Sequence, residues 1–163
     1  MQLKKALQKA IDYEQKGYEV YSDRADKISN KVMKDTFSYL AEQELLHKKV
    51  IEEFAEKNSF NIESEQESDA IQFFNTTIKD FREELDLSDD EQDIYKKALE
   101  LEKASFDYYS DLLEESEDES TRKFFKFLKE QENIHFEMLQ KAYWFIKDPE
   151  GFFAEEEKWF VEG

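Results

Sequence analysis

The chain has 163 residues, of which 41 are acidic and 23 are basic, and its formal net charge is −18. This charge argues against nucleic acid as a partner, because phosphate backbones bind basic surfaces, and the absence of cysteine excludes disulfides and thiolate metal sites. Charged residues make up 39% of a chain with three glycines and one proline, a composition that favours long helices in one domain.

The first part of the sequence predicts a helical hairpin over residues 3–57. Apolar residues recur there at alternating steps of four and three, the pattern of two helices that pack through a heptad seam. Asn30 lies in the turn and is a suitable N-cap for the second helix. Three seam positions are polar: Glu14 in the first helix, and Glu44 and His47 in the second. They lie about equally far from the turn, so we expect their side chains to meet at one level of the bundle.

A long connection over residues 58–90 leads to a second predicted hairpin over residues 91–148, with Asp118 as the N-cap of its second helix. A helix of about 27 residues is roughly 40 Å long, and the connection is long enough to return along that length. We therefore predict an all-α four-helix bundle over residues 1–148, with the single long crossover of ferritin-like folds. The aromatic tail, residues 149–163, is expected to pack on the bundle or on a dimer partner.

The two hairpins are copies of one sequence. Residues 9–23 align with 97–111, and residues 36–47 align with 124–135, without a gap. Twelve of these 27 pairs are identical, whereas chance would give roughly 6% at average residue usage. Two copies are too few for a solenoid, so the halves should pack on each other around one core.

The duplication places the same metal-ligating residue types in both halves. Each of the only two histidines follows a seam glutamate by three residues and lies on the same helix face. Another seam glutamate lies 30 residues before the glutamate of each such pair. Four buried carboxylates would be very unfavourable without compensation, and two divalent cations would balance their charge. The alternative, ordinary surface residues in an acidic chain, does not explain their place in apolar seams. The predicted ligands are Glu14, Glu44, His47, Glu102, Glu132 and His135.

Carboxylate-rich sites with one histidine per metal suit iron or manganese, and zinc is a common occupant when iron is absent. Two tyrosines, Tyr21 and Tyr109, follow Glu14 and Glu102 by seven residues and lie on the same helix face. A phenol in that place could donate a hydrogen bond to a metal-bound carboxylate. Both tyrosines could equally be core aromatic residues without a role in the site.

With these motifs in place, the chain resembles the rubrerythrin branch of the ferritin-like di-iron proteins over roughly residues 3 to 147. The resemblance implies that Glu44 and Glu132 bridge two iron ions. It implies that Glu14 and Glu102 are terminal carboxylates, and that each histidine binds one metal. The implied reaction is the reduction of hydrogen peroxide, with dioxygen as another oxidant, and the implied assembly is a homodimer.

Two departures from the family pattern stand out. Rubrerythrins carry an additional glutamate one turn after the ligand of the third helix, where this chain has Ser105, with Gly17 as its repeat mate. This difference puts the redox-linked ligand exchange of the family in doubt. Rubrerythrins also often carry a rubredoxin domain, which needs cysteine, so we expect the electron donor to be a separate protein such as a rubredoxin.

The leading hypothesis is therefore a di-iron peroxidase. The N-terminal segment becomes polar before it could form a signal core, and no segment is long and apolar enough for a membrane span, so a cytoplasmic location is expected. The alternative is a bacterioferritin-like ferroxidase or iron-storage protein. Against it, Leu45 and Asn133 follow the motif glutamates, where bacterioferritin has its haem-binding methionine. A non-enzymatic partner-binding bundle would leave the buried acids unexplained.

Overall fold

The computed structural model describes residues 2–59, 89–148, 150–152 and 154. The long helices in these ranges are α1 (Leu3–Lys27), α2 (Lys31–Lys57), α4 (Asp89–Glu115) and α5 (Glu119–Lys147). The seam residues of the sequence are buried along each helix, so the apolar face that the heptad pattern predicts is the face that packs in the core.

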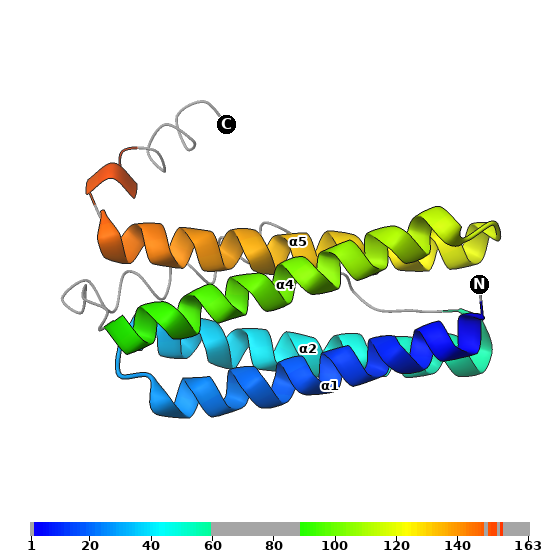
Figure 1. Cartoon of the computed structure of the whole chain (residues 1–163), viewed down its shortest axis with the longest axis horizontal. Coiled ribbons are helices and arrows are strands. Elements are labelled where there is room, and N and C mark those ends of the chain that lie inside the picture. The colour runs from blue at the N-terminus through cyan, green and yellow to red at the C-terminus, as the bar shows by residue number, and fades with distance from the viewer. Residues whose placement is uncertain (1, 60–88, 149, 153, 155–163) are drawn as a thin grey trace.

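Figure 1 shows two antiparallel hairpins, α1 with α2 and α4 with α5, that lie against each other along their lengths. Between the hairpins, α1 packs beside α4 and α2 packs beside α5. Helix α2 ends at the opposite end of the bundle from the start of α4. This arrangement confirms the predicted all-α, ferritin-like four-helix bundle. Most of the predicted crossover, residues 60–88, lies outside the described residues.

The helix starts that follow the two tight turns are capped as predicted. The side chain of Asn30 accepts a hydrogen bond from the backbone N–H of Met33 at 3.1 Å. Asp118 accepts one from the backbone N–H of Thr121 at 3.0 Å. The carboxylate of Glu91, in the first turn of α4, also accepts from the backbone N–H of Asn30 at 3.1 Å. This last bond ties the start of the second hairpin to the turn of the first.

Buried apolar residues form two clusters, one toward each end of the bundle. Along α1, Leu7 and Ala10 belong to one cluster, Tyr21 and Ala25 belong to the other, and the buried Glu14 lies between them. The other three helices repeat this order with their own buried polar residues. A polar layer therefore crosses the middle of the bundle, with an apolar cluster on each side of it.

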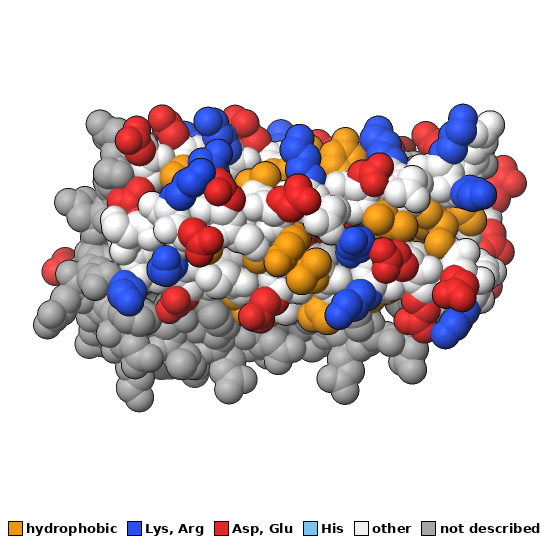
Figure 2. All heavy atoms as spheres, turned by 90° about the horizontal axis from the view of Figure 1, so that it is seen from below, with side chains coloured by type: hydrophobic (Ala, Val, Ile, Leu, Met, Phe, Trp, Pro, Cys, Tyr) orange, Lys and Arg blue, Asp and Glu red, His pale blue; other side chains and the backbone are white. Residues whose placement is uncertain are grey.

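The chain after α5 folds back onto the bundle at Phe152, which is buried and packs edge-on against Trp144 and Phe145, with ring centroids 5.5 Å apart in both pairs. Residues 155–163, which make up most of the predicted aromatic tail, lie outside the described residues. Figure 2 shows one long face, where acidic and basic side chains are interspersed with small apolar areas. None of the described helices is long and apolar enough to cross a membrane.

Candidate metal centre

The six predicted ligand residues all point into the polar layer, and none is more than 4% exposed. Helices α1 and α4 each contribute one glutamate, whereas α2 and α5 each contribute a glutamate and a histidine one turn apart. Seam positions at one level in four helices converge, which is why residues distant in sequence meet here. The converging residues are Glu14, Glu44, His47, Glu102, Glu132 and His135.

His47 faces carboxylates from both hairpins. Its Nδ1 lies 3.6 Å from Oε2 of Glu14, in its own hairpin, and 3.5 Å from Oε1 of Glu132, in the other. The imidazole ring stacks on that of His135, with ring centroids 5.1 Å apart and planes at 9°. The two rings therefore lie side by side in the middle of the bundle.

His135 repeats this arrangement with the roles of the hairpins exchanged. Its Nδ1 lies 3.7 Å from Oε1 of Glu102, in its own hairpin, and 3.3 Å from Oε1 of Glu44, in the other. The sequence duplication is thus matched by an approximate twofold arrangement of side chains. Such an arrangement provides two equivalent positions for a cation.

Two groups of four side chains can each bring ligand atoms within 4.8 Å of one another. Glu44 and Glu132 belong to both groups, as a carboxylate that bridges two ions must. Glu14 and Glu102 each belong to one group only. The groups are Glu14, Glu44, His47 and Glu132, and Glu44, Glu102, Glu132 and His135.

Several buried polar atoms of the cluster have no hydrogen-bond partner among the described residues. They are Oε2 of Glu14, both ring nitrogens of His47, Oε2 of Glu102 and both carboxylate oxygens of Glu132. Leaving one such atom unpaired costs about 1–3 kcal/mol, and more for a charged group. Metal ions would satisfy these oxygens and nitrogens together, and the donor set fits iron or manganese.

The carboxylates differ in how readily they ionise. Burial and then repulsion from Glu14 raise the pKa of Glu44 well above its ordinary value, and the same two causes raise the pKa of Glu132. Burial also acts to raise the pKa of Glu14, but the closeness of Glu44 and His47 outweighs it and lowers that pKa to about 2. Without metal, protons on Glu44 and Glu132 therefore relieve the repulsion, and metal binding must displace them.

The two tyrosines bond to glutamates across the hairpin interface. The phenol of Tyr109 donates to Oε1 of Glu14 at 2.6 Å, and the phenol of Tyr21 donates to Oε1 of Glu102. Burial, followed by nearby carboxylates, raises the pKa of both phenols far above the neutral range, so they remain donors there. The spacing placed each phenol on the correct face but did not show that its acceptor belongs to the opposite hairpin.

A model of the rubrerythrin family matches residues 5–143, a span that contains all six clustered residues. The chain belongs to the rubrerythrin family. No curated protein and no solved structure matches it at a comparable level. Rubrerythrins typically bind iron, and the buried carboxylate and imidazole groups fit a di-iron site of an oxidoreductase.

Gly17 has a role in this rubrerythrin that its place in the sequence did not reveal. A Cβ at Gly17 would lie 3.1 Å from Oε2 of Glu44 and 3.2 Å from its carboxyl carbon. A glycine in a helix interior lowers helix stability by roughly 0.5–1 kcal/mol relative to alanine. At this position the glycine leaves room for the carboxylate of Glu44, at the expense of helix stability. The repeat mate, Ser105, is buried and carries a Cβ. The two halves of the bundle therefore differ at this position.

We expect Gly17→Ala to raise the stability of the metal-free protein and to weaken metal binding. In the metal-free protein, the carboxylate of Glu44 can move aside, so the better helix former should raise the melting temperature by an amount equivalent to at most about 1 kcal/mol. A metal-bound Glu44 cannot move aside, so the further rise on adding Fe(II) or Mn(II) should shrink. Thermal melts with and without metal measure both effects. Ser105→Ala is the matched control, and a full metal-induced rise in Gly17→Ala would contradict the role of the glycine.

The raised pKa values predict that the metal-free protein loses stability as the pH rises. A carboxyl whose folded pKa is raised stabilises the fold below its ordinary value of 4.5, and that contribution is lost as the pH passes through the folded pKa. The melting temperature without metal should therefore fall as the pH rises above 4.5, while the rise on metal binding grows. Glu44→Gln, which cannot ionise, should flatten the metal-free profile. An equally steep profile in that variant would contradict the assignment.

Proposed function

We propose that this rubrerythrin is a di-iron oxidoreductase that reduces hydrogen peroxide. The observation that carries the proposal is the buried, twofold cluster of carboxylates and imidazoles with unpaired oxygens and nitrogens. In this proposal Glu44 and Glu132 would each hold both ions, because both belong to each ligand group. Glu14 and His47 would complete the ligands of one ion, and Glu102 and His135 those of the other.

Bound iron would supply the two electrons that cleavage of the O–O bond requires. The protein holds and orients the ligands. Tyr109 and Tyr21 fix the carboxylates of Glu14 and Glu102 through hydrogen bonds from the opposite hairpin. The apolar clusters on both sides keep bulk water from the polar layer, which strengthens electrostatic interactions within it. This environment favours a small, uncharged oxidant such as peroxide over a bulky substrate.

The proposal extends to the partners of the site. Dioxygen is a second candidate oxidant, and a separate protein such as a rubredoxin is the proposed donor of the electrons for a new cycle. We propose a cytoplasmic homodimer as the working state. Manganese and zinc are alternative occupants of the same ligand set.

Metal stoichiometry tests the roles of the ligands. Glu44→Ala should abolish binding of both ions, because a bridging carboxylate contacts both, whereas Glu14→Ala should weaken mainly one. Metal analysis after anaerobic loading, together with isothermal titration, measures the two outcomes. The exposed neighbour Glu42 offers the control Glu42→Ala, which should bind as the unaltered chain does. Two tightly bound ions in Glu44→Ala would contradict the proposed site.

Peroxide consumption separates reduction from iron storage. Loaded with Fe(II) and mixed with peroxide without oxygen, the protein should consume one peroxide per pair of ions and become reducible again when a donor is added. Iron loading should stop near two ions per chain, about the capacity of one bundle site. Anaerobic stopped-flow absorbance and iron analysis give these quantities. Mineral uptake far beyond that ratio, in a hollow shell of many subunits, would favour the bacterioferritin-like alternative.

A further inference from the structure

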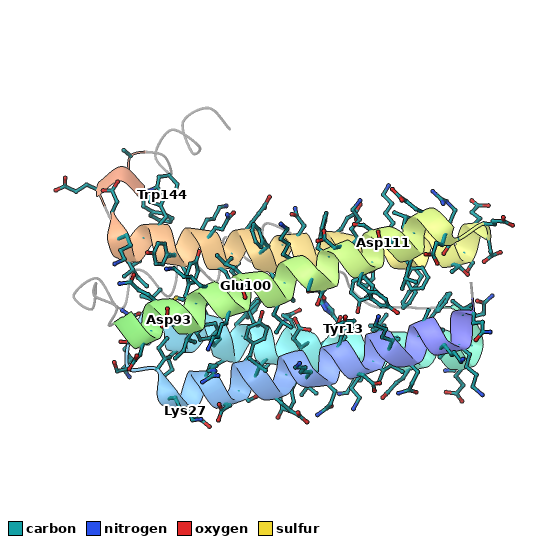
Figure 3. The ribbon with its side chains drawn as sticks, viewed as in Figure 1. Tyr13, Lys27, Asp93, Glu100, Asp111 and Trp144 are labelled. Carbon is teal, nitrogen blue, oxygen red and sulfur yellow. The ribbon has the colours of Figure 1, made fainter. Side chains whose placement is uncertain are left out.

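A row of three tyrosines connects the proposed metal centre with the protein surface. Tyr13, on the side of α1 that faces α4 in Figure 3, is partly exposed. Its ring centroid lies 5.2 Å from that of Tyr108, which lies 5.7 Å from that of the buried Tyr109. The phenol of Tyr109 then reaches Oε1 of Glu14 at 2.6 Å. Both ring distances are those of aromatic pairs in direct contact.

The outer two rings of the row are held in place. The ammonium group of Lys9 lies 4.7 Å from the ring centroid of Tyr108 and 5.7 Å from that of Tyr13. The phenol of Tyr108 donates to the backbone carbonyl oxygen of Ala6 at 3.0 Å. These contacts place both rings between α1 and α4 and limit their rotation.

The row exists in one half of the duplicated bundle only. The repeat mate of Tyr109 is Tyr21, which bonds to a ligand in the same way, but the repeat mates of Tyr13 and Tyr108 are Leu101 and Val20. Aliphatic residues therefore serve at the equivalent positions of the other half. Packing of the bundle alone does not require tyrosine there, which points to a chemical use of the phenols.

We propose that Tyr13, Tyr108 and Tyr109 form a one-electron path that carries oxidising equivalents from the metal centre to the surface. The inference rests on the proposed function, because peroxide, the proposed substrate of the site, is the oxidant that takes the electrons of the path. The path serves when the irons are already oxidised and the electron donor is absent. A one-electron reductant in solution, such as ascorbate, then restores the outermost tyrosine.

The electrons and protons of the path balance at each step. The oxidant is a second peroxide at a site whose irons are already oxidised, and its reduction to two waters takes two electrons from the path, in two passes, and two protons from solvent. In each pass Tyr109 gives one electron to this peroxide, and its phenolic proton moves along the existing hydrogen bond to Glu14. Tyr108 then gives an electron to the Tyr109 radical, whose proton returns from Glu14, and Tyr108 releases its own proton to water. Tyr13 restores Tyr108 in the same way, with a proton from water. The reductant finally supplies one electron to Tyr13, which takes up a proton from solvent.

The test uses the iron-loaded protein, reduced and mixed with excess peroxide without a donor. Freeze-quench electron paramagnetic resonance, with ring-deuterated tyrosine, detects tyrosyl radicals, and peptide mass spectrometry locates the oxidised residues. In the unaltered chain, Tyr13 should be the main tyrosine that is oxidised. Tyr108→Phe keeps the ring but removes the phenol, so oxidation of Tyr13 should be lost and the inner radical should persist longer. Undiminished oxidation of Tyr13 in Tyr108→Phe would overturn the path.

The chain offers a matched control in a second tyrosine pair. Tyr143 is partly exposed and stacks on the buried Tyr95 with ring centroids 4.4 Å apart. Tyr143→Phe should leave the radical yield and the oxidation of Tyr13 unchanged. A change as large as that in Tyr108→Phe would mean that any tyrosine substitution has the effect, and would also overturn the path. Melting curves of both variants check that they fold.

A second measurement separates failure of the path from failure of the proposed function. Peroxide consumption by the unaltered chain reports on the function alone. The metal-free protein can be oxidised from outside by a water-soluble ruthenium photo-oxidant, and a radical formed at the partly exposed Tyr108 should move outward to Tyr13, where ascorbate quenches it quickly. Tyr13→Phe keeps the ring but removes the outermost phenol, so transient absorption should show a longer-lived tyrosyl radical in that variant. Equal lifetimes in the two proteins would reject the path, whatever the peroxide assay shows.

Discussion

Burial of four carboxylates in one layer of an apolar core is the constraint on which the rest of this structure depends. Isolated in such a core, each negative charge would be strongly unfavourable. The protein without metal meets the constraint by keeping protons on Glu44 and Glu132, whose pKa values rise through burial and the repulsion of Glu14. Two divalent cations would meet it more fully, because they would also satisfy oxygens and nitrogens that lack a partner among the described residues. The polar layer of the bundle therefore favours metal binding over the stability of the metal-free fold.

Local features of each hairpin bring the ligands to one level. The caps at Asn30 and Asp118 set where α2 and α5 begin, and the turns set how far each ligand lies from the end of the bundle. A slip of one residue would rotate a side chain by about 100° around its helix and remove it from the core face. The caps do not align one hairpin with the other. The hydrogen bond from the turn of the first hairpin to Glu91 does so, because it joins the two hairpins at one end of the bundle.

Much of this arrangement could be predicted from the sequence because it depends on local patterns and on the duplication. Heptad spacing indicated the helices, and the 88-residue repeat singled out the six buried residues from a chain with 41 acids. The contacts between hairpins could not be predicted in this way. The bond from Tyr109 to Glu14, and the closeness of Gly17 to Glu44, depend on how two hairpins rotate against each other. Only the packing of the complete core decides that rotation.

The departures from twofold symmetry have a common location. Helices α2 and α5 supply the same glutamate and histidine pair, so their contributions to the two metal positions are alike. Gly17 and Tyr13 lie on α1, and their repeat mates, Ser105 and Leu101, lie on α4. The same two helices hold the tyrosine row, which lies against Glu14 and not against Glu102. The helices that each carry one of the clustered glutamates have thus diverged, while those that carry the glutamate and histidine pairs have kept their symmetry. A duplicated bundle can in this way make its two metal positions unequal without disturbing the carboxylates that join them.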